Sequence, residues 1–258
     1  MLSTQARVRD ISAALRSELK EAAYNHGYRQ ENGEADGWVY FRSDINVPGE
    51  IGLAVAEHGA AWFLSVGHAG VAGELGAPAA EPVPQGMRAA FAFAEQGDLR
   101  AALHRAYVLA STLPTLPLHE FEAAVAGLGN TEAERLTRVR IGQDHFRRAL
   151  MGYWNARCPL TGIEDPALLR ASHIVPWAEC ESDAERLDVH NGLLLAAHWD
   201  AAFDAGLISF RDDGQVIFAP SLSEHARCVL GTPRALSLTE VHQLKLARHR
   251  QRYGFHVT

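Results

Sequence analysis

Two prolines near the middle of the chain most restrict how it can fold. Pro114 and Pro117 lie in the segment Leu113–Leu118, where each fixes its own φ angle and removes a backbone donor, so a helix should not continue through them. We therefore predict that this segment is a linker. The 258 residues then form two domains, 1–118 and 119–258, which fits the usual domain size of roughly 150 residues.

The sequence before the linker predicts a small mixed α/β domain. A helix should run from a cap at Ser3 to about His26, because apolar residues recur there at helical spacing and Gly27 follows. Three strands and then a mostly helical segment are expected at 37–43, 50–56, 61–66 and 87–111. His58 and His68 should be structural residues near strand ends. Target recognition and dimerisation both remain open as roles for this domain.

The second domain should begin with a long helix and continue with shorter elements. Thr131 and Glu134 form the capping-box pattern of a helix start, and Gly142 predicts a kink or break in that helix. The shorter elements expected are strands at 168–175 and 191–195, a helix at 198–205, and a hairpin at 207–218 around an Asp-Gly turn.

Charge is distributed unevenly along the second domain. The net charge of the chain is −7, but residues 131–157 carry +3 and residues 227–258 carry +5, on either side of a segment with −9. Phosphate binding depends on where cations lie and not on the total. The candidate DNA contacts are therefore Arg135, Arg138, Arg147, Arg148, Lys245 and Arg248. Charge alone is equally consistent with solvated helix faces.

Cysteine usage and hydropathy limit the class of protein. The three cysteines, at 158, 180 and 228, form no Cys-x-x-Cys pair, so neither a disulfide framework nor a four-cysteine zinc site is expected. The first residues are charged throughout and resemble no signal peptide. Charged residues interrupt the longest apolar stretch, so no membrane span is expected. These features predict a reduced, cytoplasmic setting.

Three short segments together carry the residue types that phosphodiester hydrolysis requires. Such a hydrolase needs a base to activate water and a divalent cation to neutralise the leaving oxygen. A histidine on one strand, an asparagine before the next, and acidic or imidazole groups on the following helix supply them. The segments are Ala171-Ser-His-Ile-Val-Pro176, His190-Asn-Gly-Leu-Leu-Leu195 and His198-Trp-Asp-Ala-Ala-Phe-Asp-Ala-Gly206.

These segments, in this order, resemble the HNH endonuclease family. The resemblance is closest to a branch in which Cys-x-x-Thr-Gly precedes the catalytic histidine and Asn-Gly-Leu-Leu-Leu leads to Phe-Asp-x-Gly. It covers about residues 130–220 and does not reach residues 1–120. It implies an α+β fold whose C-terminal part is a ββα-metal nuclease module with flanking helices, in which two antiparallel strands and a helix hold one metal ion.

The resemblance implies a role for each motif residue. His173 would be the general base, and Asn191 would steady it; the structural alternatives are a buried strand histidine and a simple Asn-Gly turn. Asp200 would be the first metal ligand and His198 the second. Asp204 is one turn further on, where a structural hydrogen bond is the alternative.

One position departs from the family pattern and bears on the metal. Many members carry Asp or His immediately before the base as a cation ligand, whereas this chain has Ser172. One divalent cation per site is still expected, Mg²⁺ or Mn²⁺, because these ions prefer oxygen ligands. No structural zinc is expected, because Cys158 and Thr161 stand where some members have a Cys-x-x-Cys pair.

The sequence therefore predicts a metal-dependent DNA endonuclease, of the kind used in bacterial restriction or defence. Its partner would be double-stranded DNA. Cutting both strands would need two such sites, which suggests a homodimer. Ser172 motivates an alternative, a non-catalytic DNA-binding protein on a degenerate HNH scaffold. A third possibility, an exported toxin, is disfavoured because no export segment is visible. The target site, any need for base modification, and activity on RNA stay open.

Overall fold

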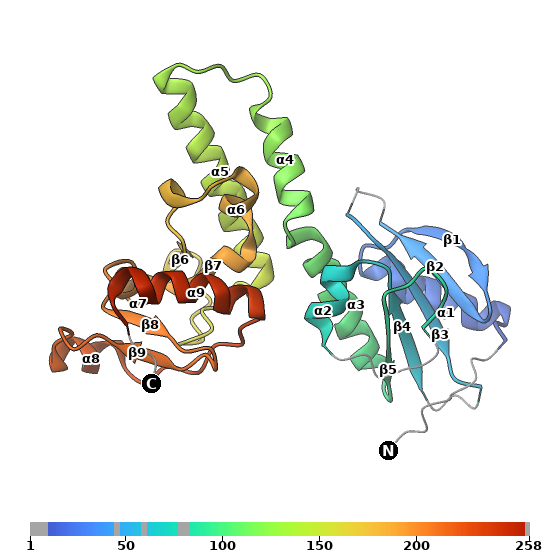
Figure 1. Ribbon diagram of the computed structural model, residues 1–258. Helices are drawn as coiled ribbons and strands as arrows, with labels where there is room; N and C mark the ends of the chain where they lie inside the picture. Colours follow the sequence, from blue (N-terminus) through green and yellow to red (C-terminus); the bar gives the residue numbers. More distant parts are fainter. Residues whose placement is uncertain (1–9, 44–46, 58–60, 77–82, 256–258) are drawn as a thin grey trace. The chain divides into compact units, whose positions relative to one another are not determined.

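The structure is a computed structural model that describes residues 10–43, 47–57, 61–76 and 83–255. It separates into two compact units, Met1–Ser111 and Thr112–Thr258, and is a mixed α+β fold (Figure 1). None of the helices in the described ranges combines the length and apolar character needed to cross a bilayer.

The first unit is built on a five-stranded antiparallel sheet in which each strand pairs with the next along the chain. Its elements are α1 (Ala13–Asn25), β1 (Gln30–Ala35), β2 (Trp38–Arg42), β3 (Glu50–Val55), β4 (Trp62–Val66), α2 (Ala69–Leu75), β5 (Ala89–Phe93) and most of α3 (Gln96–Thr112). Trp38, Phe63 and Ala90 belong to one apolar cluster on this sheet. The three predicted strands correspond to β2, β3 and β4.

Several predictions for this unit are wrong. The first helix begins at Ala13, where the Ser12 side chain accepts a hydrogen bond from the Leu15 amide, and the predicted cap at Ser3 lies outside the described residues. The segment predicted as helical from residue 87 contains β5, because backbone pairing with β4 outweighs the helix propensity of its alanines. By contrast, His68 has the structural role predicted for it, because its Nδ1 accepts from the Val71 amide at 3.2 Å and caps α2. His58 is outside the described residues.

The predicted linker, 113–118, is too long, because α4 (Thr115–Val125) begins inside it. The preceding helix does end before Pro114, at Thr112. Pro117 lies in the first turn of α4, where backbone N–H groups have no partner within the helix, so a proline costs little there. The boundary between the two compact units falls between Ser111 and Thr112, just before these prolines.

The second unit starts with two antiparallel helices, α4 and α5 (Glu132–Tyr153), which pack side by side (Figure 1). The capping box at Thr131 and Glu134 is confirmed: each residue bonds the other's backbone N–H. The remaining elements are β6 (Leu169–His173), η1 (Trp177–Glu179), α6 (Asp183–Leu187), η2 (Val189–Asn191), β7 (Gly192–Ala196), α7 (Ala197–Asp204), β8 (Ile208–Phe210), β9 (Val216–Phe218), α8 (Glu224–Leu230) and α9 (Glu240–Tyr253).

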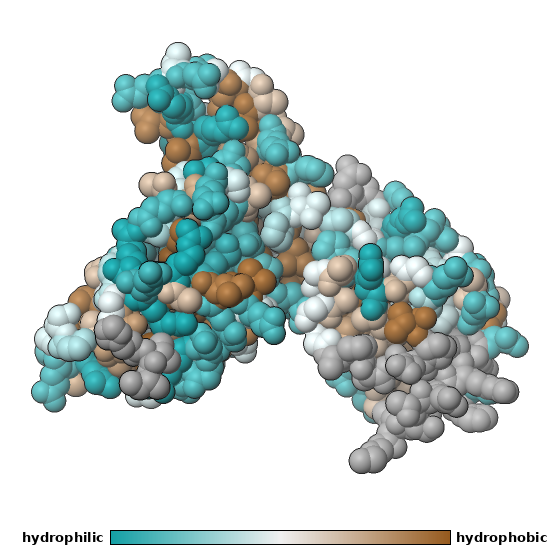
Figure 2. All heavy atoms as spheres, in the orientation of Figure 1, coloured by the Kyte–Doolittle hydropathy of each residue, from teal (hydrophilic) through white to brown (hydrophobic). Residues whose placement is uncertain are grey.

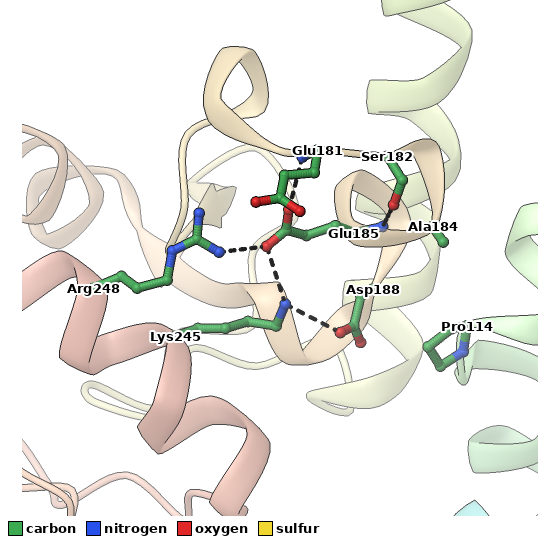
Figure 3. A pocket seen from close by; sticks show the side chains of 8 residues that line it. All are labelled: Pro114, Glu181, Ser182, Ala184, Glu185, Asp188, Lys245 and Arg248. Atoms are coloured by element: carbon green, nitrogen blue, oxygen red, sulfur yellow. Dashed lines mark hydrogen bonds and ion pairs between the residues drawn. The ribbon is translucent and has the colours of Figure 1, made fainter.

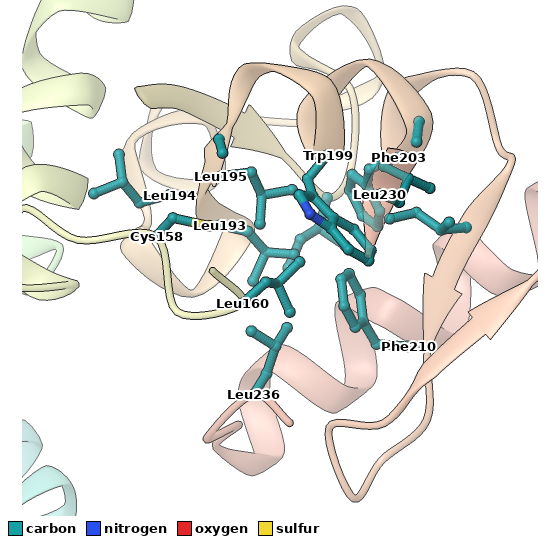
Figure 4. Packing of buried hydrophobic residues seen from close by; sticks show 14 of the residues in the cluster. Cys158, Leu160, Leu193, Leu194, Leu195, Trp199, Phe203, Phe210, Leu230 and Leu236 are labelled. Atoms are coloured by element: carbon teal, nitrogen blue, oxygen red, sulfur yellow. The ribbon is translucent and has the colours of Figure 1, made fainter. Parts of the chain in front are cut away.

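A continuous apolar core supports the second half of this unit. Leu193 and Leu195 of β7 pack with Trp199 and Phe203 of α7 and with Phe210 of β8 (Figure 4). Each of these five side chains is completely buried, and burying a large apolar side chain contributes about 1.5–3 kcal/mol. The visible surface outside this core is mostly hydrophilic (Figure 2).

Gly142 has a packing role in α5. Of the predicted kink or break, the break is wrong, because the helix runs through Gly142 without interruption. A Cβ atom at this position would overlap the Trp177 ring, and Gly142 is buried. The glycine therefore makes room for the ring of Trp177, which packs against His173.

Replacing Gly142 with alanine should destabilise the protein although alanine favours helix. The added methyl group must displace Trp177 or α5, and overpacking of this kind costs about 1–3 kcal/mol. Chemical denaturation followed by circular dichroism measures the change. Gly73→Ala in α2, where no atom lies near the new methyl group, is the matched control and should be neutral or slightly stabilising. Equal stability of the two variants would contradict this packing role.

Candidate active site

Two antiparallel strands and a helix bring the motif residues together. β6 pairs with β7 so that His173 lies opposite Gly192, and α7 begins directly after β7. Gly192 is needed at this place because a Cβ atom would lie 2.5 Å from the Phe146 ring. The predicted strand–strand–helix order is therefore present in the second unit.

Ser172 and Asp200 form a direct pair between β6 and α7. The Ser172 hydroxyl donates a hydrogen bond of 2.6 Å to Asp200 Oδ1. Ser172 is only 2% exposed, while Asp200 is half-buried. The residue that departs from the family pattern thus lies beside the carboxylate that was predicted as the metal ligand.

His173 lies on the opposite face of β6, because side chains alternate along a strand. Its ring stacks on Phe146 with 3.7 Å between centroids and meets the edge of Trp177 at 5.6 Å. This enclosure lowers the pKa of His173 to about 4, because burial disfavours the charged imidazolium, and the hydrogen bond to Arg186 opposes the shift only in part. The imidazole is therefore neutral at pH 7.

The hydrogen bond made by His173 fixes which ring nitrogen carries the proton. His173 Nε2 lies 2.9 Å from the main-chain carbonyl of Arg186. A carbonyl oxygen can only accept, so Nε2 holds the hydrogen and Nδ1 has the lone pair. A neutral imidazole with a lone pair on Nδ1 is chemically equipped to accept a proton.

Asn191 is completely buried and holds the chain that follows His173. Its Oδ1 accepts from the Val175 amide at 2.9 Å. Its Nδ2 lies within donor distance of three acceptors, the carbonyls of Val175 and Glu185 and the sulfur of Cys180. The side chain therefore cross-links the end of β6 to α6 and does more than form a turn.

The other two polar residues of α7 differ in their surroundings. His198 is exposed, and its ring contacts that of the neighbouring Trp199. Asp204 is also exposed, and partial burial, followed by the nearby charge of Asp200, raises the pKa of its carboxyl group. The structural hydrogen bond at this position uses the main-chain carbonyl of Asp204, which accepts from Tyr253, so the carboxylate remains available.

These donors fit a hard divalent cation. The Asp200 carboxylate and the Ser172 hydroxyl are oxygen donors. Asp204 is a second carboxylate, close enough to Asp200 that the charge of Asp200 contributes to raising the pKa of Asp204. Mg²⁺ is commonly held by one or two carboxylates plus substrate phosphates. Among the described residues no group of three His, Cys, Asp or Glu side chains could hold a metal, so a complete protein cage is not available to an ion here.

Most of the predicted DNA-binding cations have intramolecular partners. Arg147 donates to the carbonyls of Leu169 and Pro166 at 2.8 and 2.7 Å, which holds the start of β6 against α5. The ion pairs are Arg138 with Asp183, Arg148 with Glu120, Lys245 with Glu185 and Asp188, and Arg248 with Glu185. Arg135 is exposed and has no side-chain partner within the described ranges. DNA binding by these residues stays a prediction.

Two residues that contribute to the site were not found from the sequence. Trp177 covers the His173 ring, and Arg186 supplies the carbonyl that the ring contacts. Neither belongs to the three motif segments. The only local signal is the spacing of Asp183 and Arg186, which form an i,i+3 ion pair on α6.

The comparison with protein families supports the resemblance for this part of the chain. Residues 158–211 match a family model described as HNH endonuclease, and this segment contains Ser172, His173, Asn191, His198 and Asp200. A search of curated proteins finds no match. The match lies in the C-terminal half of the chain and suggests nuclease activity there. HNH nucleases in general act on nucleic acid and use a divalent metal ion.

Proposed function

We propose that this protein is a metal-dependent HNH endonuclease that hydrolyses DNA phosphodiester bonds, in the role of a bacterial restriction or defence enzyme. The observation that carries the proposal is the neutral His173 ring with its lone pair on Nδ1. This ring is on the strand that also carries Ser172, which bonds Asp200 of α7. These groups are the base and the cation ligands that this reaction needs.

In the proposed reaction His173 Nδ1 accepts a proton from the attacking water. The water oxygen bonds to phosphorus while the bond from phosphorus to the leaving oxygen breaks. Asn191 keeps the end of β6 in place, so that the imidazole does not need to reorient during the step. Asp200 and Ser172, with Asp204 or His198 nearby, would hold the divalent cation, which when bound neutralises charge on the phosphate oxygens.

A second candidate function is DNA binding without cleavage. It is favoured by Ser172, whose hydroxyl replaces a charged ligand and is bonded to Asp200. Incubating the protein with modified and unmodified plasmid DNA in Mg²⁺, Mn²⁺ or EDTA separates the two functions. Metal-dependent nicking or linearisation supports the endonuclease, and retained DNA with no cleavage in any metal supports the binding protein.

Replacing His173 with alanine should remove the general base while leaving DNA binding in place. Cleavage should fall by roughly 10²–10⁴-fold, the usual contribution of general acid–base catalysis. Initial rates on plasmid DNA and a gel-shift titration measure the two properties. His225→Ala, at an exposed histidine of α8, is the control and should cut normally. A rate within a few-fold of wild type for His173→Ala would exclude this residue as the base.

Replacing Asp200 with alanine should raise the Mg²⁺ or Mn²⁺ concentration needed for half-maximal cleavage. Removing a residue that only hydrogen-bonds to a metal ligand lowers metal affinity by about 10–100-fold. Removing the ligand itself should therefore lower the affinity by at least as much. Metal titrations of the cleavage rate measure the effect, with Asp144→Ala at an exposed position of α5 as control. Cleavage by metal-free wild-type protein in EDTA would contradict the role of a cation.

Arg135 and Arg147 should affect DNA binding differently, because only Arg147 is bonded to main-chain carbonyls. If Arg135 neutralises one phosphate, Arg135→Ala should make the slope of log K for DNA binding against log salt concentration less steep by about 0.9. Arg147→Ala should leave that slope unchanged and lower stability instead. Binding measured from about 50 to 300 mM salt in Ca²⁺, which limits cleavage, gives both slopes. An unchanged slope for Arg135→Ala would remove Arg135 from the DNA path.

A further inference from the structure

The short helix α6 supplies main-chain acceptors to two of the motif residues, His173 and Asn191. His173 Nε2 contacts the carbonyl of Arg186, and Asn191 Nδ2 contacts the carbonyl of Glu185. The last carbonyls of a helix have no partner within the helix, so they are available to side chains. The orientation of the His173 ring therefore depends on where the end of α6 lies.

The side chain of Arg186 ties α6 to the segment that leads into it. Its guanidinium donates to the carbonyls of Trp177 and Cys180, at 3.2 and 2.7 Å, and to Asp183 at 2.9 Å. It also lies 5.8 Å from the centroid of the Trp177 ring. A planar guanidinium can bond several acceptors at once in a fixed geometry, so one side chain closes residues 177–186 into a compact arc.

That arc surrounds His173. Trp177, held through its carbonyl by Arg186, presents its ring to the imidazole at 5.6 Å between centroids. The same tryptophan occupies the space left by Gly142 on α5. Arg186 thus governs both the acceptor of the His173 hydrogen bond and the position of the tryptophan ring that packs against the imidazole.

A second set of contacts holds the outer side of α6. Glu185 pairs with Lys245 and Arg248 of α9, and Lys245 also pairs with Asp188 (Figure 3). These residues line a cavity of about 450 Å³. Lys245 and Asp188 are both largely buried, with 14% of each side chain exposed. This outer set limits movement of α6 toward solvent, whereas Arg186 fixes its inner side.

From these contacts we infer that Arg186 is a positioning residue for His173, acting through its own main-chain carbonyl. The inference rests on the proposed function of His173 as the base. Arg186 does not touch the reacting atoms. Its guanidinium fixes the end of α6 so that the carbonyl accepts from Nε2–H, and the lone pair is left on Nδ1.

Arg186→Ala tests the inference through a readout that does not require cleavage. Nitrogen-15 NMR of the histidine rings reports the tautomer of His173, whose signal is assigned by its loss in His173→Gln. In wild type we expect the Nε2–H form alone. In Arg186→Ala we expect both tautomers, a kcat lower by about 10-fold or more, and unchanged DNA affinity.

Two further variants make the test specific. Arg227→Ala in α8 removes an arginine that lies over Phe218, so the His173 tautomer and kcat of this variant should match wild type. Arg186→Lys keeps the positive charge but places all its donors on one nitrogen. The His173 tautomer ratio and kcat should therefore change in the same direction as in Arg186→Ala, but by a smaller amount. It replaces Arg186→Ala if that variant does not fold.

The outcomes separate this inference from the proposed function. An unchanged His173 tautomer together with an unchanged kcat, in whichever Arg186 variant folds, overturns the positioning role. A wild-type protein that cuts no DNA in any metal overturns the proposed function instead. In that case the tautomer measurement alone still supports or overturns the link from Arg186 to the His173 ring.

Discussion

The buried amide of Asn191 is the interaction on which the candidate site depends. An unpaired amide in a protein interior costs roughly 1–3 kcal/mol, so the surrounding backbone must arrange itself to satisfy it. Here the amide joins the end of β6 to α6 through Val175 and Glu185. Because the chain between these points is held at both ends, the segment that carries Trp177 and leads to Arg186 follows a compact path. The positions of the His173 acceptor and of its aromatic cover follow from that path.

Elements whose signals are local could be predicted from the sequence. The capping box at Thr131 and Glu134, the Asp-Gly turn before β9 and the helix after β7 each depend on neighbouring residues. β5 depends on pairing with another strand, and the start of α4 depends on the tolerance of a first helical turn for proline. β5 exists because β4 offers a paired edge, and α4 begins where a proline is harmless. The helix or strand propensity of a single segment reveals neither the pairing of β5 with β4 nor the position of the proline within the first turn of α4.

The candidate site divides in the same way. The identities of His173, Asn191 and Asp200 come from motifs, and the family match covers all three. Their surroundings come from packing between segments far apart in sequence: Phe146 of α5, Trp177 of η1 and Arg186 of α6 meet at one imidazole. Charge patterning located the basic segments but not their partners, because Lys245 and Arg248 face carboxylates from a different helix. A net charge carries no information about such pairing.

The serine beside Asp200 has a consequence for the protein when it carries no ion. Two carboxylates held at this separation would repel each other, and one of them would tend to take up a proton. A hydroxyl–carboxylate pair has no such repulsion, because the hydroxyl donates its hydrogen to Oδ1. The strand and helix are therefore joined at this point by a hydrogen bond within the protein. A pair of this kind has one unit of negative charge less than two carboxylates, and its geometry does not depend on a cation to offset repulsion.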